Sequence, residues 1–133
     1  MGPNRLKYLD LIQAIISRLA GNQFTLRTWS VGLGSAIIGY AATKDAHVQA
    51  AYLGSASAVI FWILDAYYLG LERAYRHLYN QECVKADDTP TMSLKVNPSV
   101  TDYLTAWTRP AVWFVHLPVF FLGLFVGGRV WPR

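Results

Sequence analysis

Few residues in this 133-residue chain have the types and spacing that catalysis requires. The three histidines, His47, His77 and His116, belong to three different segments, and the single cysteine, Cys83, stands beside Glu82. The sequence contains no Gly-rich phosphate loop, no nucleophile elbow and no paired-histidine metal motif. One cysteine allows neither an internal disulfide nor a cysteine-based zinc site. We therefore expect no catalytic residue, no enzymatic activity, no metal and no cofactor.

The basic residues are better candidates for chemistry, because they could bind a polyanion. Those expected on one side of a membrane, with His77 nearby, are Arg5, Lys7, Arg18, Arg27, Arg73, Arg76 and Lys85. In one interpretation they set membrane topology and contact anionic lipid headgroups, at about 1 kcal/mol per contact. In the other they form a polyanion-binding surface, which an oligomer would repeat around one axis. Composition alone favours the lipid interpretation.

A second group of polar residues lies within or beside apolar stretches. The candidates for a pore or its gate are Ser30, Ser35 and Asp65. Ionisable groups at membrane depth usually face protein or water. Asp65 could therefore pair with Arg27 or Arg73, or line a pathway. On the same helix face, Glu72 and Arg76 are four residues apart and can form an ion pair.

The elements that position these residues follow from where charge is absent. Apolar residues make up 53% of the chain and charged residues 15%, against about 25% charge in soluble domains. The stretches without Asp, Glu, Lys or Arg are 28–43, 46–64 and 110–128. A membrane-spanning helix needs about 20 mostly apolar residues, and a chain of this length cannot cover three such helices with protein. We predict transmembrane helices at 26–44, 47–69 and 110–129.

The distribution of lysine and arginine predicts the orientation of these spans. Nine of the twelve basic residues precede the first span or lie between the second and third, and Lys44, Arg129 and Arg133 lie on the other side. We therefore predict that the N-terminus and residues 70–109 are cytoplasmic and that the C-terminus lies outside.

The segment before the first span has apolar residues at helical spacing. It predicts an amphipathic helix over residues 5–20, ended by Gly21 and Asn22. Such a helix could lie on the membrane surface or pack against the cytoplasmic end of the bundle, and the short turn that follows favours packing.

The remaining segments predict one long helix, one short helix and a kink. The helical pattern of the second span continues into the cytoplasm, so we expect one helix from about 47 to 83. Residues 86–99 are polar and predict a loop, and 100–107 could form a short helix at the surface. Pro110 fits the first turn of the third span, and Pro118 inside it should kink the helix. The predicted fold class is an all-α membrane protein with a single domain.

Small residues at four-residue intervals occur in all three predicted spans, and this spacing lets helix backbones approach closely in lipid. They are Ser35 and Gly39, then Ala46, Ala50, Gly54 and Ala58, then Gly123 and Gly127. They could serve packing inside one subunit or self-association. We expect a homo-oligomer, because three helices enclose little volume.

The run from Trp62 to Arg73 has the pattern Trp-x-Leu-Asp-x-Tyr-x-Leu-x-x-Glu-Arg. With the flanking residues of the stretch 9–80, it resembles a family of small bacterial inner-membrane proteins encoded beside nucleotidyltransferase-like genes in antiphage islands. That family is the HalA-type membrane effectors of the Hailong defence system. The segment from Val84 onward carries no motif of the family, so the third span depends on hydropathy alone.

The resemblance implies an oligomeric, channel-like effector, with a tetramer as the working stoichiometry. A partner nucleotidyltransferase would make a short single-stranded deoxyadenylate oligomer, which would hold the channel closed in a basic chamber. Loss of this ligand during phage infection would open the channel, depolarise the inner membrane and arrest growth, as in abortive infection. The resemblance points to Arg73 and Arg76 as ligand-binding residues, with Arg18 and Arg27 as further candidates.

Two other functions compete with the channel. The protein could be a non-conducting anchor that recruits a cytoplasmic enzyme through residues 70–109. It could also be a small transporter subunit, but transporters often carry coupling ionisable residues at mid-membrane. We expect none within the three charge-free stretches.

Overall fold

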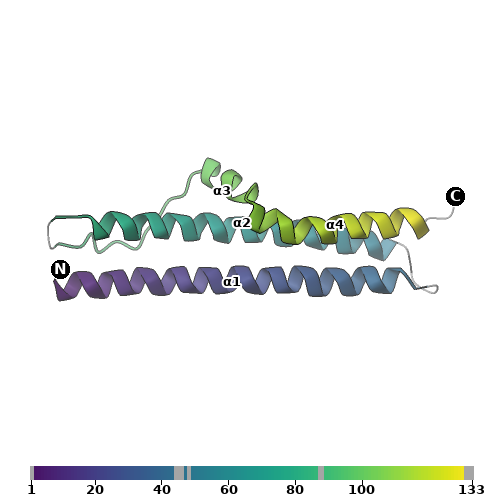
Figure 1. Cartoon of the computed structure of the whole chain (residues 1–133), viewed down its shortest axis with the longest axis horizontal. Helices are drawn as coiled ribbons and strands as arrows, with labels where there is room; N and C mark the ends of the chain where they lie inside the picture. The colour runs from purple at the N-terminus through teal and green to yellow at the C-terminus, as the bar shows by residue number, and fades with distance from the viewer. Residues whose placement is uncertain (1, 44–46, 48, 87–88, 131–133) are drawn as a thin grey trace.

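The computed structural model describes residues 2–43, 47, 49–86 and 89–130, and within these ranges the fold is all-helical. In chain order the helices are α1 (Pro3–Ala41), α2 (Gln49–Cys83), α3 (Val100–Trp107) and α4 (Pro110–Val130). The first two lie antiparallel, and α4 lies beside the half of this pair that is far from the N-terminus (Figure 1). The predicted all-α class is therefore confirmed.

The first helix differs from the sequence expectation, because α1 is continuous over 39 residues and does not end at Gly21 and Asn22. The buried residues of α1 nearest to Gly21 are three or four positions apart on both sides of it. Ile12 and Ile16 precede this glycine, and Gln23 follows it. A glycine inside a helix costs about 1 kcal/mol relative to alanine. Packing along α2 on both sides of Gly21 outweighs this local cost, so the predicted amphipathic helix and first span are one element.

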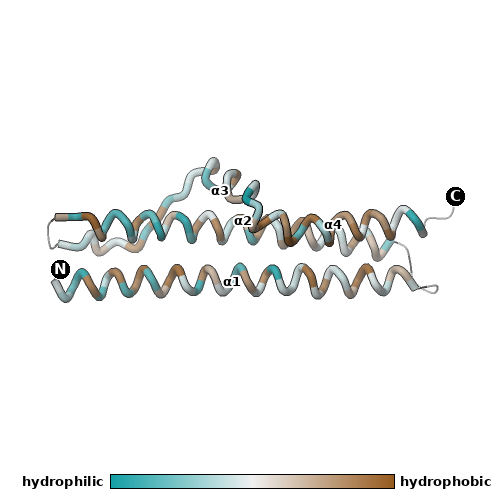
Figure 2. Tube along the Cα trace, in the orientation of Figure 1, coloured by the Kyte–Doolittle hydropathy of each residue, from teal (hydrophilic) through white to brown (hydrophobic). Residues whose placement is uncertain are grey.

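Among the residues that the structure describes, two helices are long and apolar enough to cross a membrane, α2 and the α4 segment Pro110–Arg129. About a third or less of each apolar window is buried, 33% in α2 and 28% in α4. Figure 2 shows apolar residues gathered along α4 and the part of α2 beside it, whereas the rest of α2 has more hydrophilic residues among its apolar ones. The chain therefore has two halves. In the apolar three-helix half, α4 lies beside α1 and α2, and the more polar two-helix half contains the remaining parts of α1 and α2.

Close helix packing in the three-helix half depends on glycines. A Cβ on Gly54 would lie 2.6 Å from Ile38 Cγ1, and a Cβ on Gly123 would lie 2.1 Å from Ser55 Oγ. Ser55 donates a hydrogen bond of 2.9 Å to the Phe120 carbonyl, which joins α2 to α4. These small residues serve packing inside one subunit.

The short helix α3 has the bounds that the sequence predicted, 100–107. Ser99 and Asp102 form a reciprocal capping box at its N-terminus. Tyr103 stacks on Tyr67 of α2 with ring centroids 5.4 Å apart. The fourth helix begins at Pro110, as predicted, and Pro118 lies inside it.

The two-helix half has its own core, built from α1, α2 and the segment that follows α2. Tyr8, Ile12 and Ile16 form its buried centre. The partly buried residues that pack on this centre are Tyr75, Leu78, Tyr79 and Leu94. Since Leu94 belongs to the segment returning from α2 toward α3, this half contains a third layer of chain that is not helical.

Candidate functional site

A polar cluster lies between α1, α2 and α4 in the three-helix half. Its members are Arg27 and Ser30 from α1, Asp65 from α2 and His116 from α4. The side chains of Ser30, Asp65 and His116 are fully buried, and that of Arg27 is 27% exposed. Because Arg27 and Ser30 are three residues apart, they lie on the same face of α1. This face is the one that packs against the other two helices.

The hydrogen bonds of the polar cluster centre on Asp65. Its Oδ2 accepts from Arg27 Nε at 2.8 Å and lies 3.1 Å from His116 Nε2. Arg27 Nη2 lies 3.3 Å from the other carboxylate oxygen. On the far side of the imidazole, His116 Nδ1 lies 2.7 Å from Ser30 Oγ. With a neutral histidine, one cation and one anion balance each other, which is the arrangement that buried charges require.

The surroundings of the polar cluster are apolar. His116 is six residues beyond Pro110, or about 9 Å along the axis of α4 at 1.5 Å per residue. Trp29, Ile63 and Phe114 are large apolar side chains exposed on the outer faces of the same three helices. Buried ionisable groups in a bundle with an apolar exterior are costly, and they commonly mark a functional site.

A chain of polar contacts extends the cluster into the two-helix half. Arg27 Nη2 lies 3.3 Å from Gln23 Oε1, and Gln23 Nε2 donates to Glu72 Oε2. Glu72 in turn pairs with Arg76, whose Nη2 lies 2.7 Å from Oε1. These contacts therefore lead from the buried His116 to Arg76, an exposed residue of α2 in the two-helix half. This confirms the predicted Glu72–Arg76 pair and, of the two partners considered for Asp65, supports Arg27.

The order Ser30–His116–Asp65 contains the residue types of a hydrolase triad, but its geometry does not suit hydrolysis. All three side chains are fully buried, so a substrate cannot reach the Ser30 hydroxyl in this conformation. No oxyanion-binding arrangement is formed by the contacts described for these side chains, and such donors supply much of the rate in acyl transfer. The arrangement can instead hold opposite charges in contact within the bundle.

The predicted ligand-binding arginines do not meet in one site within a single chain. Arg27 belongs to the polar cluster, Arg76 is paired with Glu72, and Arg18 is exposed on α1. Arg73 lies elsewhere, in a groove described below. Of the pore candidates, Ser30 and Asp65 come together, whereas Ser35 is exposed and outside the cluster.

Sequence reasoning missed two members of these networks, His116 and Gln23. The absence of Asp, Glu, Lys and Arg does not take histidine into account, and it therefore predicts no ionisable residue within 110–128. That expectation is wrong, because His116 lies inside this stretch and contacts Asp65. Its presence in the most apolar segment of the chain was the available signal. Gln23 carried no comparable signal, because its partner Glu72 is 49 positions away.

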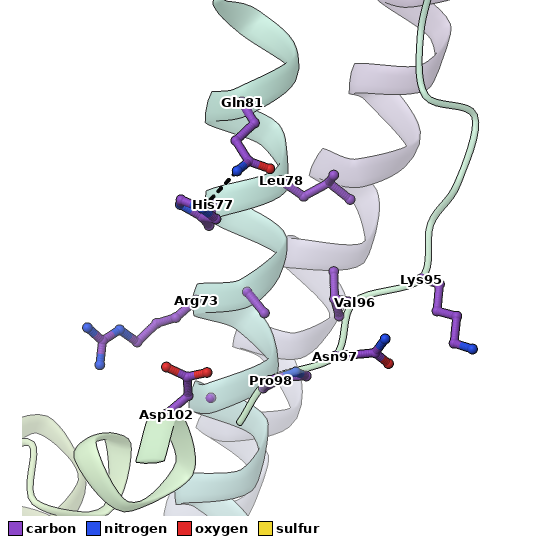
Figure 3. A pocket seen from close by; sticks show the side chains of 11 residues that line it. Arg73, His77, Leu78, Gln81, Lys95, Val96, Asn97, Pro98 and Asp102 are labelled. Carbon is purple, nitrogen blue, oxygen red and sulfur yellow. Dashed lines mark hydrogen bonds between the residues drawn. The ribbon is translucent and has the colours of Figure 1, made fainter. Parts of the chain in front are cut away.

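A second candidate site is a groove of about 530 Å³ between α2, the N-terminus of α3 and the segment that returns from α2. We call it the basic groove, and its polar lining residues are Arg73, His77, Gln81, Lys95, Asn97 and Asp102. In Figure 3, Arg73 extends beside Asp102, while Lys95 extends from the returning segment on the other side of the groove. The two cations therefore lie on opposite sides of the groove and do not converge on one point.

Electrostatics within the basic groove favour an ionised Asp102. Hydrogen bonds from the backbone N–H and the hydroxyl of Ser99 lower the pKa of Asp102, and the positive charge of Arg73 adds a smaller effect in the same direction. His77 adds a ring whose Nε2 lies 3.0 Å from Gln81 Nε2. At neutral pH the groove contains two cations and one carboxylate, and it retains a net positive charge.

The structure thus describes a helical protein with two candidate membrane spans, a buried polar cluster and a basic groove. Comparison of the chain with protein-family models, with curated proteins and with solved structures found no match.

Proposed function

We propose that this protein is a channel-like effector of the bacterial inner membrane and has no enzymatic activity. In this proposal the three-helix half crosses the membrane, with residues 26–44 of the chain as the third span beside α2 and α4. The N-terminus and the two-helix half are cytoplasmic, and the C-terminus is periplasmic. The large number of basic residues expected on the cytoplasmic side supports this orientation.

One observation carries the proposal, the charge-balanced contact of Arg27, Asp65 and His116 inside a bundle with an apolar exterior. A simple anchor needs only apolar side chains at this depth. Ionisable groups are expensive there, and they are typical of ion pathways, proton relays and gates.

The resemblance of the Trp62–Arg73 run supplies the biological setting. We propose that the effector acts in antiphage defence by depolarising the membrane, and that a nucleotide or oligodeoxynucleotide ligand keeps it closed. The ligand class would be a short single-stranded deoxyadenylate oligomer from a partner nucleotidyltransferase. The basic groove supports a polyanion with several charges better than a single phosphate, because Arg73 and Lys95 extend on opposite sides of it (Figure 3).

Assembly into a homo-oligomer, with a tetramer as the working stoichiometry, completes the proposal. Arg18 is exposed on α1, and Arg73 and Arg76 are exposed on α2. Repeating these cations around one axis would focus the potential on a central ligand. Ser35 and Gly39 are exposed small residues on α1, so this face is open to close contact with a second copy. Membrane lipids are the other expected partners.

The test is to express the protein alone in bacteria and to follow membrane potential with a voltage-sensitive dye. A channel released from its ligand should depolarise the cells and stop growth. An Asp65→Asn variant tests whether the effect depends on the polar cluster, and Asp10→Asn, at an exposed position on α1, is the matched control. A polarised, growing culture would contradict spontaneous conduction and would support a non-conducting anchor that recruits a cytoplasmic enzyme.

A further inference from the structure

His116 has a different partner on each ring nitrogen, and this arrangement makes its protonation state consequential. Nε2 lies 3.1 Å from Asp65 Oδ2, and Nδ1 lies 2.7 Å from Ser30 Oγ. An ionised carboxylate can only accept a hydrogen bond. The proton of the neutral ring therefore belongs on Nε2, where it is donated to Asp65. Nδ1 is then an acceptor, and the Ser30 hydroxyl donates to it.

We propose that His116, held between Asp65 and Ser30, is a proton-binding site inside the helical bundle, and that its protonation loosens the packing of α4 against α1. Histidine is the side chain whose unperturbed charge change falls between about pH 5 and 8. The imidazole is fully buried at the point where three helices meet. A change in its charge therefore acts on all three helices at once.

The first consequence of protonation concerns the contact between α1 and α4. A proton on Nδ1 converts this nitrogen from an acceptor to a donor, so the Ser30 hydroxyl must turn its own hydrogen toward another acceptor. A serine or threonine inside a helix commonly uses the carbonyl four residues earlier. Thr28 of α1 already does so, donating 2.9 Å to the Phe24 carbonyl. The corresponding acceptor for Ser30 is the Leu26 carbonyl, so the direction of the α1–α4 hydrogen bond would reverse.

The second consequence is electrostatic. The charged groups that face His116 are Asp65 from α2 and, across that carboxylate, Arg27 from α1. Glu72 and Arg76 follow further along the polar chain and form their own pair. With a neutral ring the Arg27–Asp65 charges cancel, and a protonated ring leaves one positive charge uncompensated. An uncompensated buried charge is strongly unfavourable unless water reaches it. Protonation therefore favours a more hydrated bundle in which α4 packs less tightly.

The first arm of the test measures proton binding directly and does not depend on channel activity. The full chain, labelled with ¹⁵N-histidine, is placed in bilayers of phosphatidylethanolamine and phosphatidylglycerol and titrated from about pH 5 to 8, the range in which histidine changes charge. The resonance absent from a His116→Gln variant is assigned to His116. We expect this ring to convert from the neutral to the cationic chemical-shift pattern. A ring that keeps one charge state throughout this pH range would overturn the proposal.

The second arm rests on the proposed channel function and measures ion flux from vesicles of the same two lipids with a voltage-sensitive dye. Flux should rise as the pH falls, by at most about tenfold per pH unit, the slope that one bound proton gives. His116→Gln should remove this dependence, because the amide has a donor and an acceptor for the same two partners but no titratable nitrogen. His47→Gln, at an exposed position in the α1–α2 connection, should retain it.

The outcomes of the two arms are distinguishable. Flux that stays equally pH-dependent in His116→Gln would overturn the gating role of this histidine. If the wild-type protein conducts at no pH, the proposed channel function fails, and the histidine titration still decides whether the proton-binding site exists. If His116→Gln does not insert into the bilayer, the His116 resonance is assigned instead as the one that remains in the His47→Gln/His77→Gln variant, since the chain has three histidines, and the same titration applies.

Discussion

Asp65 and His116 are 51 positions apart in the chain, and their side chains meet at 3.1 Å with no exposed surface on either. Arg27 of α1 contacts the same carboxylate. This one carboxylate therefore joins three helices. Both proposals for this protein depend on this contact, which ties α1, α2 and α4 together at one level of the bundle.

Removing Asp65 alone should destabilise the bundle. Breaking one side of a fully buried ion pair costs about 3–5 kcal/mol, and the 27% exposure of the Arg27 side chain places the Asp65→Ala loss toward the lower end. The double variant Arg27→Leu/Asp65→Leu should recover most of it, since apolar replacement of both partners leaves no unpaired charge. Thermal unfolding in detergent, followed by circular dichroism, measures both. Equal losses in the single and double variants would contradict the ion-pair explanation.

Replacing Arg73 and Arg76 together with alanine should abolish binding of a labelled single-stranded deoxyadenylate oligomer. Phosphate contacts weaken steeply with salt, so wild-type affinity should fall as ionic strength rises, and the residual affinity of the variant should fall less. Fluorescence anisotropy at several salt concentrations is the measurement. Arg129→Ala removes a positive charge near the far end of α4 and serves as the control. Unchanged binding in the double variant would remove these residues from the ligand site.

Gly123→Ala should weaken the contact between α2 and α4. The added Cβ would lie 2.1 Å from Ser55 Oγ and 2.8 Å from the Ala51 carbonyl oxygen, so the helices must separate. Overpacking of this kind costs about 1–3 kcal/mol. Gly128→Ala is the matched control on the same helix, because its Cβ would meet nothing within 4 Å. Comparable melting temperatures for the two variants would contradict the packing described here.

The two-helix half should lose stability in acid through Glu82. Burial acts to raise the pKa of this carboxyl, but hydrogen bonds from Lys85 and Thr91 outweigh burial and hold the pKa below its ordinary value of 4.5. Since the folded-state pKa is depressed, the stabilisation is present above pH 4.5 and is lost as the pH falls through the folded-state value. Glu82→Gln should be less stable at neutral pH and should show a weaker acid dependence. Parallel loss of stability in both proteins below pH 4.5 would contradict this role.

The single cysteine offers a direct measurement of orientation. Cys83 is exposed at the C-terminus of α2, in the two-helix half. If that half is cytoplasmic, a membrane-impermeant maleimide should label Cys83 only after intact cells are permeabilised. A Cys83→Ser/Arg129→Cys variant should show the opposite pattern, because the end of α4 is expected in the periplasm. Labelling of Cys83 in intact cells would reverse the proposed topology.

Local patterns in the sequence were sufficient for much of the secondary structure. The all-α class, the long second helix and the helix at 100–107 follow from composition and from periodicity within single segments. The expected break at Gly21 failed because the cost of one glycine is local and small, whereas burial along α2 continues on both sides of it. Of the three predicted spans, α2 and α4 satisfy the length and hydropathy requirement.

The sequence by itself determined which segments are helical, which are apolar and that Glu72 could pair with Arg76, because each depends on residues within a few turns of one another. Only the tertiary structure decided that Asp65 pairs with Arg27 rather than Arg73, and that His116 and Ser30 complete the same cluster. The physical reason is that contacts between helices depend on their axial alignment and rotation. These are set by the packing of many side chains and glycines along α1, α2 and α4, and no single segment encodes them.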